Sequence, residues 1–386
     1  GRTPEGADGA GVRGILPSAR KIDNSRCGSC TWITPMKRVL ITGITGQDGA
    51  YLAHYLLEKG YEVYGIYRRL STPNFWRLQY LDVFDRVHLI GADLIDEGSL
   101  IEAIHISEPD EVYHLAAQSF VWSSFEEPIS TAEMTGLGVT RILEAIRHVN
   151  RDIRFYQAST SELFGFSSED GPLTEASPFQ PQSPYAAAKL YGYWITTIYR
   201  KGYGMFACNG ILFNHESPIR GLEFITRKLS NAAARISLGL QKEISVGNLD
   251  AMRDWGYAPD YVESMWMMLQ EDEPDDYVVA TNESHSVREF AEKVFSRVGL
   301  DYRDHVKVDK KFLRPLDVRY LQGDYRKARE QLGWKPKVNF DELVSLMVKA
   351  DLERWERWMR GEQFPWDAIH YPHENKILSR SQRMDR

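Results

Sequence analysis

The sequence predicts an α/β protein built on a doubly wound parallel sheet, with a smaller and mostly helical C-terminal lobe. From residue 37 onward, short and almost continuously apolar runs alternate with segments of helical period. After about residue 214 this alternation loosens and helical segments predominate. Strands buried on both faces read as continuous apolar runs, so the alternation indicates a parallel sheet covered by helices on both sides.

The individual elements follow from the same pattern. We expect strands at residues 39–42, 62–66, 87–90, 111–115, 153–158 and 205–212. We expect helices at residues 47–58, 98–106, 131–148 and 184–200, and in the later part of the chain at 222–238 and 261–270. Ser183 and Pro184 mark the start of the helix at 184, because serine caps helix N-termini well and proline suits the first turn.

The chain divides into four predicted parts. Residues 1–35 are Gly-rich and aperiodic, and we interpret them as a disordered leader or as an artificially added segment. Residues 36–213 are expected to form the sheet domain, to which later segments can return, and residues 214–352 the C-terminal lobe that binds substrate. Residues 353–386, which carry Trp355, Trp358 and Trp366, are expected to form a packed helix and extension.

Composition excludes several classes of protein. The 386 residues are 43% hydrophobic, which is enough for an ordinary core, and the formal net charge of -7 argues against nucleic-acid binding. We see neither a membrane span nor a signal peptide, so a cytoplasmic protein is expected. Cys27 and Cys30 have CxxC spacing, but no second Cys/His pair accompanies them, and no metal site is predicted.

A glycine-rich turn follows the first predicted strand. Gly43, Gly46 and Gly49 form a GxxGxxG pattern between that strand and the next helix. Glycines at such a turn allow a tight bend and let backbone N–H groups and the helix N-terminus approach a pyrophosphate. The turn therefore predicts dinucleotide binding by a Rossmann-type domain, the alternative being a purely structural turn.

The end of the second strand favours NADP as the dinucleotide. An acidic residue there accepts a hydrogen bond from the ribose 2′-hydroxyl of NAD, whereas arginine accommodates the 2′-phosphate of NADP. This strand ends in Arg68 and Arg69, with no acid nearby. The alternative interpretation is a pair of solvated surface arginines.

Four residues form a candidate catalytic set. Tyr185 and Lys189 are four apart on a predicted helix, so they share one face, where an ammonium group can favour the phenolate and hold a ribose. Thr160 and Glu162 follow a predicted strand, at the sheet edge where active-site groups collect. Taken singly, Tyr-x-x-x-Lys is usually a surface helix face and Glu162 a loop or helix-start acid.

Together, the glycine turn, Thr160 and the Tyr-x-x-x-Lys pair resemble the extended branch of the short-chain dehydrogenase/reductase superfamily, whose members mostly act on nucleotide-activated sugars. Longer runs narrow the resemblance to the GDP-mannose 4,6-dehydratase family, which the chain matches over about residues 36–352. These runs are ITGITGQDGAYL at 41–52, LAAQSFV at 115–121, FYQASTSELF at 155–164, GILFNHESP at 210–218, RDWG at 253–256 and DYV at 260–262.

The resemblance implies a role for each matching residue. Thr160, Glu162 and Tyr185 occupy catalytic positions, and Lys189 supports Tyr185. The positions that contact NADP are Gly43, Ile44, Thr45, Gly46, Gln47, Asp48, Gly49, Arg68, Arg69, Asp93, Leu94, Leu115, Ala116, Ala117, Gln118, Ser119, Lys189, His215 and Arg220. The positions that contact the nucleotide sugar are Ser119, Asn214, Lys228, Arg253 and Arg314. It also implies a homodimer or homotetramer.

The implied reaction converts GDP-mannose to GDP-4-dehydro-6-deoxy-mannose and water, with no net redox change. The chain departs from the family at Ile219, Ser130 and Asp317, where many or some members have Arg, Tyr and Glu. A dehydratase or 4-keto reductase for another GDP-sugar is the nearest alternative. A non-catalytic NADP-binding module would have no reason to keep all four catalytic residues.

Overall fold

The computed structural model describes residues 36–72, 74–165, 171–313, 316 and 318–362. The predicted leader with its Cys27 and Cys30 lies outside the described residues, as do Arg314, Asp317 and Trp366.

A seven-stranded parallel sheet forms the centre of the fold, and this confirms the predicted class. Its strand order is β11-β6-β5-β4-β1-β2-β3. The order runs outward in both directions from the first strand, which is the signature of a doubly wound sheet. The strands are β1 (Arg38–Thr42), β2 (Glu62–Tyr67), β3 (His88–Gly91), β4 (Glu111–His114), β5 (Arg154–Ala158), β6 (Ala207–Leu212) and β11 (Tyr277–Val279).

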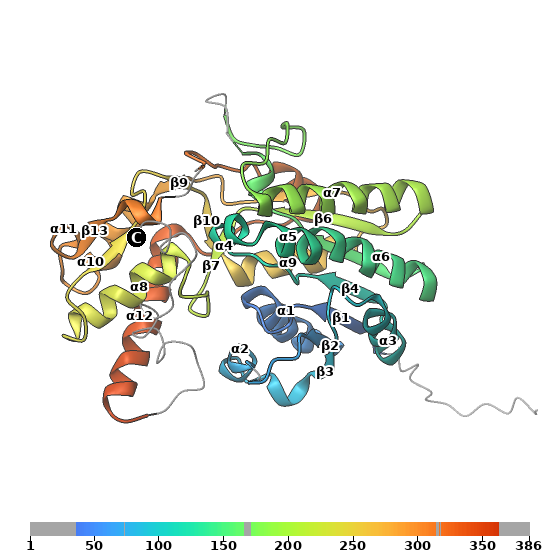
Figure 1. Cartoon of the computed structure of the whole chain (residues 1–386), viewed down its shortest axis with the longest axis horizontal. Coiled ribbons are helices and arrows are strands. Elements are labelled where there is room, and N and C mark those ends of the chain that lie inside the picture. Colours follow the sequence, from blue (N-terminus) through green and yellow to red (C-terminus); the bar gives the residue numbers. More distant parts are fainter. Residues whose placement is uncertain (1–35, 73, 166–170, 314–315, 317, 363–386) are drawn as a thin grey trace, which may run out of the picture. The chain divides into compact units, whose positions relative to one another are not determined.

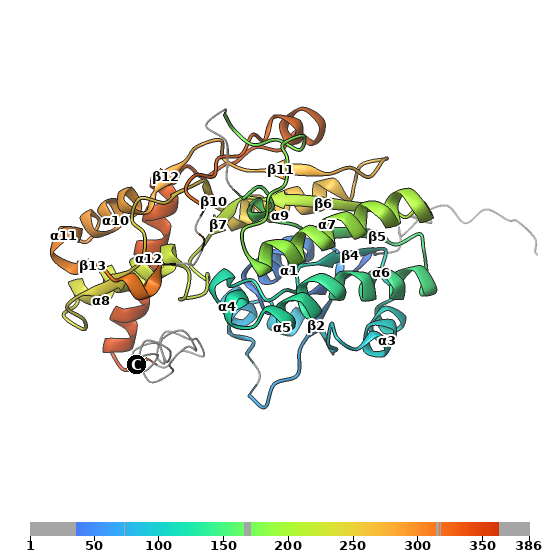
Figure 2. The same ribbon diagram turned by 45° about the horizontal axis from the view of Figure 1, so that its top comes forward.

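Helices cover both faces of this sheet (Figures 1 and 2). One face carries α3 (Glu97–Ser107), α6 (Gly138–Val149) and α7 (Pro184–Tyr203), and the other carries α1 (Gln47–Glu58) and α9 (Ala258–Met268). Successive strand residues point to opposite faces. In β1, Leu40 accordingly packs with the α3 and α6 side, while Val39 and Ile41 pack with the α1 side.

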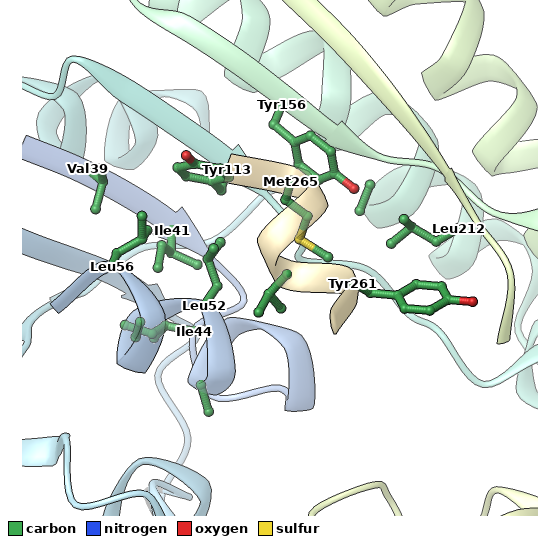
Figure 3. Close-up of a cluster of buried hydrophobic side chains, with 14 of the residues drawn as sticks. Val39, Ile41, Ile44, Leu52, Leu56, Tyr113, Tyr156, Leu212, Tyr261 and Met265 are labelled. Carbon is green, nitrogen blue, oxygen red and sulfur yellow. The ribbon is translucent and has the colours of Figure 1, made fainter. Parts of the chain in front are cut away.

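The core under α1 and α9 is shown in Figure 3, where Leu52 of α1 and Met265 of α9 approach the strand residues Tyr113 and Tyr156. All four side chains are fully shielded from solvent. Burying such side chains supplies the main driving force for docking both helices, at about 1.5–3 kcal/mol for an aliphatic one. This core also fixes the N-terminus of α1 at the carboxyl edge of the sheet.

Several predicted elements differ from the observed ones. Strand β11 was not predicted individually, but the sequence analysis expects that segments after residue 213 can contribute to the sheet domain. The helix expected at 131–148 is divided into α5 (Pro128–Thr131), the π-helical η2 (Ala132–Leu137) and α6. The connecting segments also contain α2 (Trp76–Tyr80), η1 (Phe84–Arg86), α4 (Val121–Glu126) and η3 (Ser161–Leu163).

The later part of the chain contains a second helical group. It consists of α8 (Ile225–Ser237), α10 (Val287–Ser296), α11 (Tyr302–His305) and α12 (Phe340–Met359), of which α8, α10 and α12 pack on one another. Short strands pair within this part: β7 (Asn214–Glu216) with β10 (Trp255–Tyr257), β8 (Ile244–Val246) with β13 (Val306–Val308), and β9 (Met252–Arg253) with β12 (His285–Ser286). The remaining turns are η4 (Lys310–Phe312) and η5 (Ala328–Leu332).

A buried ion pair joins α8 to α12. Arg227 Nε lies 2.9 Å and 3.0 Å from the two carboxylate oxygens of Asp351, and both side chains are almost completely buried. Arg354 and Ser230 donate further hydrogen bonds to the same carboxylate, at 2.9 Å and 2.6 Å. A buried carboxylate is tolerated when its lone pairs are filled in this way. The α12 helix begins with a capping box between Asn339 and Glu342.

None of the helices in the described part of the chain combines the length and the apolar content that a membrane crossing needs.

Candidate active site

A cleft of roughly 1290 Å³ lies between the carboxyl edge of the sheet and the α8 side of the later helical group. It brings together nearly all the residues predicted to act on cofactor or substrate. Those lining it are Gly43, Thr45, Gly46, Gln47, Asp48, Gly49, Arg68, Asp93, Leu94, Leu115, Ala116, Ala117, Gln118, Ser119, Thr160, Glu162, Tyr185, Lys189, Asn214, His215, Arg220, Lys228 and Arg253. Ile44 is fully buried in the core below the turn, and Arg69 is exposed outside this lining.

The glycine turn has no room for side chains at two positions. Gly43 has φ +74°, and a Cβ there would lie 2.8 Å from the backbone nitrogen of Ala116. A Cβ on Gly49 would lie 2.3 Å from the carbonyl oxygen of Gly43. Gly46 is the N-cap of α1, a helix of 12 residues. The turn therefore presents bare backbone and a helix N-terminus to the cleft, which suits a phosphate group.

A charged pair anchors the first turn of α1. His215 Nε2 lies 2.8 Å from Asp48 Oδ2, and its Nδ1 lies 2.7 Å from the carbonyl oxygen of Phe213. Both partners can only accept, so both ring nitrogens carry a proton and the ring is cationic. Burial alone would raise the pKa of Asp48, but the charge and hydrogen bond of His215 outweigh it and hold that pKa at about 2. The pKa of His215 is raised, because the charge of Asp48 outweighs its burial.

Gln47 extends this pair into a network. Its amide nitrogen donates to Asp48 Oδ1 at 3.0 Å and to the carbonyl oxygen of His215 at 3.1 Å. Its amide oxygen accepts from the Ser217 hydroxyl at 2.7 Å. The first turn of α1 is thus tied to the segment that follows β6.

Thr160 and Glu162 follow strand β5, and both side chains are about nine-tenths buried. Thr160 caps η3, and its hydroxyl oxygen accepts a hydrogen bond from the Glu162 N–H at 3.3 Å. This local bond places the hydroxyl and the carboxylate on the same wall of the cleft. A hydrogen-bond donor and a proton acceptor are therefore available side by side.

Tyr185 and Lys189 lie on α7, whose predicted start at Ser183 is confirmed. The Ser183 hydroxyl accepts from the N–H of Ala186 at 3.0 Å. Burial raises the pKa of Tyr185, the hydrogen bond of Thr160 lowers it and the charge of Glu162 raises it. Lys189 Nζ lies 5.9 Å from the centroid of the Tyr185 ring.

A hydrogen bond to a backbone carbonyl fixes the ammonium group of Lys189. Its Nζ donates to the carbonyl oxygen of Ala158 at 2.7 Å. Burial lowers its pKa to about 8, against an opposing contribution from Asp48. The group remains mostly charged at neutral pH, and two of its three N–H bonds are left for other contacts.

The α8 side of the cleft supplies positive charge. Lys228 lies with its Nζ 4.1 Å from the centroid of the Phe312 ring. Arg253 is buried to about nine-tenths and donates to the carbonyl oxygens of Met252 at 2.8 Å and Val318 at 2.7 Å. Asn214 Oδ1 is buried on the cleft wall without a hydrogen-bond partner among the described residues. This wall is suited to an anionic, hydroxyl-rich ligand.

The sequence did not single out several residues of the cleft. Ser159 Oγ is buried there without a hydrogen-bond partner in the described part of the chain. Arg235 and Phe312 also line the cleft. Arg235 lies seven residues after Lys228 on the same helix. This spacing places both residues on one helix face and is the signal that could have identified Arg235.

Ile219, which stands where many members of the family have arginine, is packed in the core. Ile219 is fully buried, and its carbonyl oxygen accepts from Arg77 Nε at 2.8 Å. Arg77 also donates to the carbonyl oxygen of Thr45 in the glycine turn at 3.2 Å. Ser130 lies exposed on α5.

The doubly wound sheet, the glycine turn and the Tyr-x-x-x-Lys helix define the extended short-chain dehydrogenase/reductase class. Solved structures support the fold. A UDP-glucose 4-epimerase of Thermus thermophilus has a TM-score of 0.72 at 27% identity, over 81% of this chain and 98% of that one. A dTDP-glucose 4,6-dehydratase of Bacillus anthracis has a TM-score of 0.73 at 19% identity. The match covers 84% of this chain and 100% of that one.

Within that class, the chain belongs to the GDP-mannose 4,6-dehydratase family, whose sequence model matches residues 40–347. It is 52% identical to GDP-mannose 4,6 dehydratase 1 of Arabidopsis thaliana over 340 residues, which is 86% of this chain and 94% of the relative. It is 49% identical to the GDP-mannose 4,6 dehydratase of Homo sapiens over 362 residues, which is 87% of this chain and 96% of the relative. The resemblance stated from the sequence is confirmed.

Proposed function

We propose that the protein is a hydro-lyase that converts GDP-mannose to GDP-4-dehydro-6-deoxy-mannose and water. The observation that carries this proposal is the gathering of Thr160, Glu162, Tyr185 and Lys189 on one cleft. Opposite them stand the cationic residues of the later helical group, Lys228 and Arg253. Membership of the GDP-mannose 4,6-dehydratase family selects the reaction from those that this class of fold supports.

The cleft fits a nicotinamide dinucleotide, and we propose NADP. The bare backbone at Gly43 and Gly49 and the N-terminus of α1 would hold the pyrophosphate. Arg68, at the end of β2 and on the cleft wall, would hold the 2′-phosphate. Lys189 would donate to the nicotinamide ribose. When bound, NADP supplies the acceptor for the hydride that leaves C4 of the sugar and the donor of the hydride that returns at C6.

Tyr185 and Thr160 would act at C4. Tyr185 accepts the proton of the C4 hydroxyl as that carbon is oxidised, and Thr160 hydrogen-bonds the same oxygen. Burial raises the pKa of Tyr185, while the hydrogen bond of Thr160 lowers it. Burial has the larger effect, so the pKa of Tyr185 is raised overall and the Thr160 hydrogen bond offsets only part of that rise.

Glu162 would act at C5 and C6. A ketone at C4 acidifies the C5 proton, which the carboxylate of Glu162 removes. The resulting carboxylic acid then protonates the C6 hydroxyl, which leaves as water. When a hydride adds at C6, C5 takes up one proton, which balances the proton that Tyr185 accepted from the C4 hydroxyl. A reductase or epimerase with the same tyrosine and lysine has no need of a base at C5, so Glu162 is the residue that distinguishes a dehydratase.

The test is to incubate the protein with GDP-mannose and a catalytic amount of NADP, with and without added NADPH. A dehydratase releases one water per sugar and consumes no NADPH. Stoichiometric loss of NADPH with a keto-sugar would indicate a 4-keto reductase. Binding of NADP without turnover of any GDP-sugar would indicate a non-catalytic module.

We also propose that the protein assembles as a homodimer or homotetramer in the cytoplasm. The α7 helix exposes Tyr191, Trp194 and Ile198, which are 41%, 50% and 55% exposed and share one helix face by their spacing. Ile129 of the neighbouring α5 is 79% exposed. A stripe of large apolar side chains on two adjoining helices is suited to pack against a second copy of this chain.

A further inference from the structure

The last turns of α12 contact the cleft wall through residues that lie beyond the stretch matched by the family model, which ends at residue 347. Trp355 is 3% exposed, and its indole N–H donates to Asn231 Oδ1 of α8 at 2.7 Å. The guanidinium carbon of Arg235 lies 5.1 Å from the centroid of the same indole. One tryptophan therefore contacts two successive turns of α8.

Arg235 lines the cleft and is 9% exposed. It stands on α8 with Lys228, and Lys311 of η4 also lines this part of the cleft. An arginine held over an aromatic ring has less rotational freedom than one in solvent, so its planar fork of N–H groups is directed more narrowly. Planar, oriented N–H groups suit bidentate binding of a phosphate better than a flexible ammonium does.

The ion pair of Asp351 fixes the helix that carries this tryptophan. Asp351 accepts from Arg227, and Arg227 Nη1 in turn donates to the carbonyl oxygen of Arg220 at 2.9 Å. Arg220 is itself a residue of the cleft wall. The distance between α12 and the cleft is thus set at two points, one through Asp351 and one through Trp355.

We propose that Arg235 binds the diphosphate of the nucleotide sugar and that Trp355 is a positioning residue that holds Arg235 in the binding geometry. The ligand class, a nucleoside diphosphate linked to a sugar, rests on the proposed function. The geometry of Arg235 and Trp355 does not depend on it. Binding of GDP alone can therefore be measured separately from turnover.

The experiment measures GDP affinity of the full chain by calorimetry, for the wild type, Arg235→Gln, Trp355→Leu and the double variant. Arg235→Gln should weaken GDP binding by at least about tenfold, because the charge-assisted bidentate contact with the phosphate is lost. Trp355→Leu should weaken it severalfold alone and add nothing when Arg235 is already replaced. Trp355→Phe, which keeps the aromatic face, should retain most of the affinity and guards against a folding defect in the leucine variant.

Leu346→Ala is the matched control, because Leu346 lies on the same helix, is 38% exposed and is nine residues away from Trp355. It should leave the GDP affinity within about twofold of the wild type. In turnover assays, Arg235→Gln should raise KM for GDP-mannose and leave kcat nearly unchanged, as expected when uniform binding is lost.

An unchanged GDP affinity in Arg235→Gln would overturn the inference, as would a loss confined to NADP. Equal losses from Trp355→Leu in the presence and absence of Arg235 would show that Trp355 does not act through Arg235. Absence of wild-type turnover with GDP-mannose would instead contradict the proposed function, and the GDP titrations would still decide the role of Arg235.

Discussion

The Nε2 atom of His215 lies 2.8 Å from Oδ2 of Asp48, although 167 residues separate the two in sequence. Asp48 stands in the first turn of α1, beside the proposed site of the cofactor pyrophosphate. A carboxylate alone would repel that group, and the protonated imidazole of His215 neutralises it. The pair therefore serves the electrostatics of the cleft as well as the docking of α1.

This pair predicts a pH window for stability. The folded pKa of Asp48 is depressed to about 2 from 3.8, so its contribution is present above pH 3.8 and is lost as pH falls toward 2. The folded pKa of His215 is raised from 6.5, so its contribution is complete below pH 6.5 and is lost as pH rises through the folded value. The coupling free energy should be largest between these limits.

A double-mutant cycle with Asp48→Asn and His215→Gln, followed by chemical denaturation, measures that coupling. We expect about 1–3 kcal/mol near pH 5, the range for a buried charged hydrogen bond, with a decline above neutral pH. A coupling that stays constant from pH 5 to pH 9 would contradict a cationic His215.

Replacing Glu162 separates binding from elimination. Glu162→Gln should bind NADP and GDP-mannose normally, because it keeps the side-chain shape, but should lose turnover by on the order of 10²–10⁴. Mass spectrometry of the product and calorimetry of binding check the two parts. Glu102→Gln, on the exposed side of α3, is the control and should behave as the wild type. Near-normal water release by Glu162→Gln would refute its role as the base.

The lowered pKa of Lys189 predicts pH-dependent cofactor binding. Burial brings this pKa to about 8, so the ammonium loses its charge as pH rises from 7 to 9. If the charged form holds the ribose, the Kd for NADP should increase across that range in the wild type. In Lys189→Met the affinity should be weaker at pH 7 and flatter across the range. Parallel pH profiles for the two proteins would exclude this role.

Arg68 and Arg69 should differ in their effect on cofactor choice. Arg68 lines the cleft, and Arg69 is exposed outside it. Arg68→Ala should weaken NADP binding by roughly tenfold or more while leaving NAD binding nearly unchanged, since only the 2′-phosphate contact is lost. Arg69→Ala should have the smaller effect. Fluorescence titrations with both dinucleotides decide the point, and equal losses for NAD and NADP would contradict it.

The exposed stripe of α7 predicts the assembly surface. Trp194→Glu places a charge on that stripe without disturbing the buried face of the helix, so it should shift a dimer or tetramer toward a smaller species. Light scattering coupled to gel filtration measures the mass. Exposed Trp358→Glu on α12 is the control. An unchanged mass for Trp194→Glu would place the interface elsewhere.

Most of the sheet could be predicted because its strands are buried on both faces and long enough to read as apolar runs. Strand β11 was missed because it has three residues between charged and polar segments. Its place beside β6 depends on tertiary pairing that local sequence does not encode. The paired strands of two and three residues in the later part of the chain were missed for the same reason.

The candidate site was predictable where chemistry follows a strand end, as at Gly43 and Thr160. Arg235 was not predicted, although it lies seven residues after the predicted Lys228 and therefore on the same face of α8. The protonation of His215 could not be predicted either, because it depends on a contact with Asp48, which is 167 residues away in sequence. Arg68 and Arg69 were predicted together, and the sequence did not indicate that only Arg68 lines the cleft.

GDP-mannose carrying deuterium at C4, with a catalytic amount of NADP, distinguishes an internal dehydration from other reactions. We expect a product lighter by one water that keeps the deuterium at C6, with no accumulation of NADPH. Release of the deuterium into the NADPH pool, or consumption of the sugar without loss of water, would contradict it.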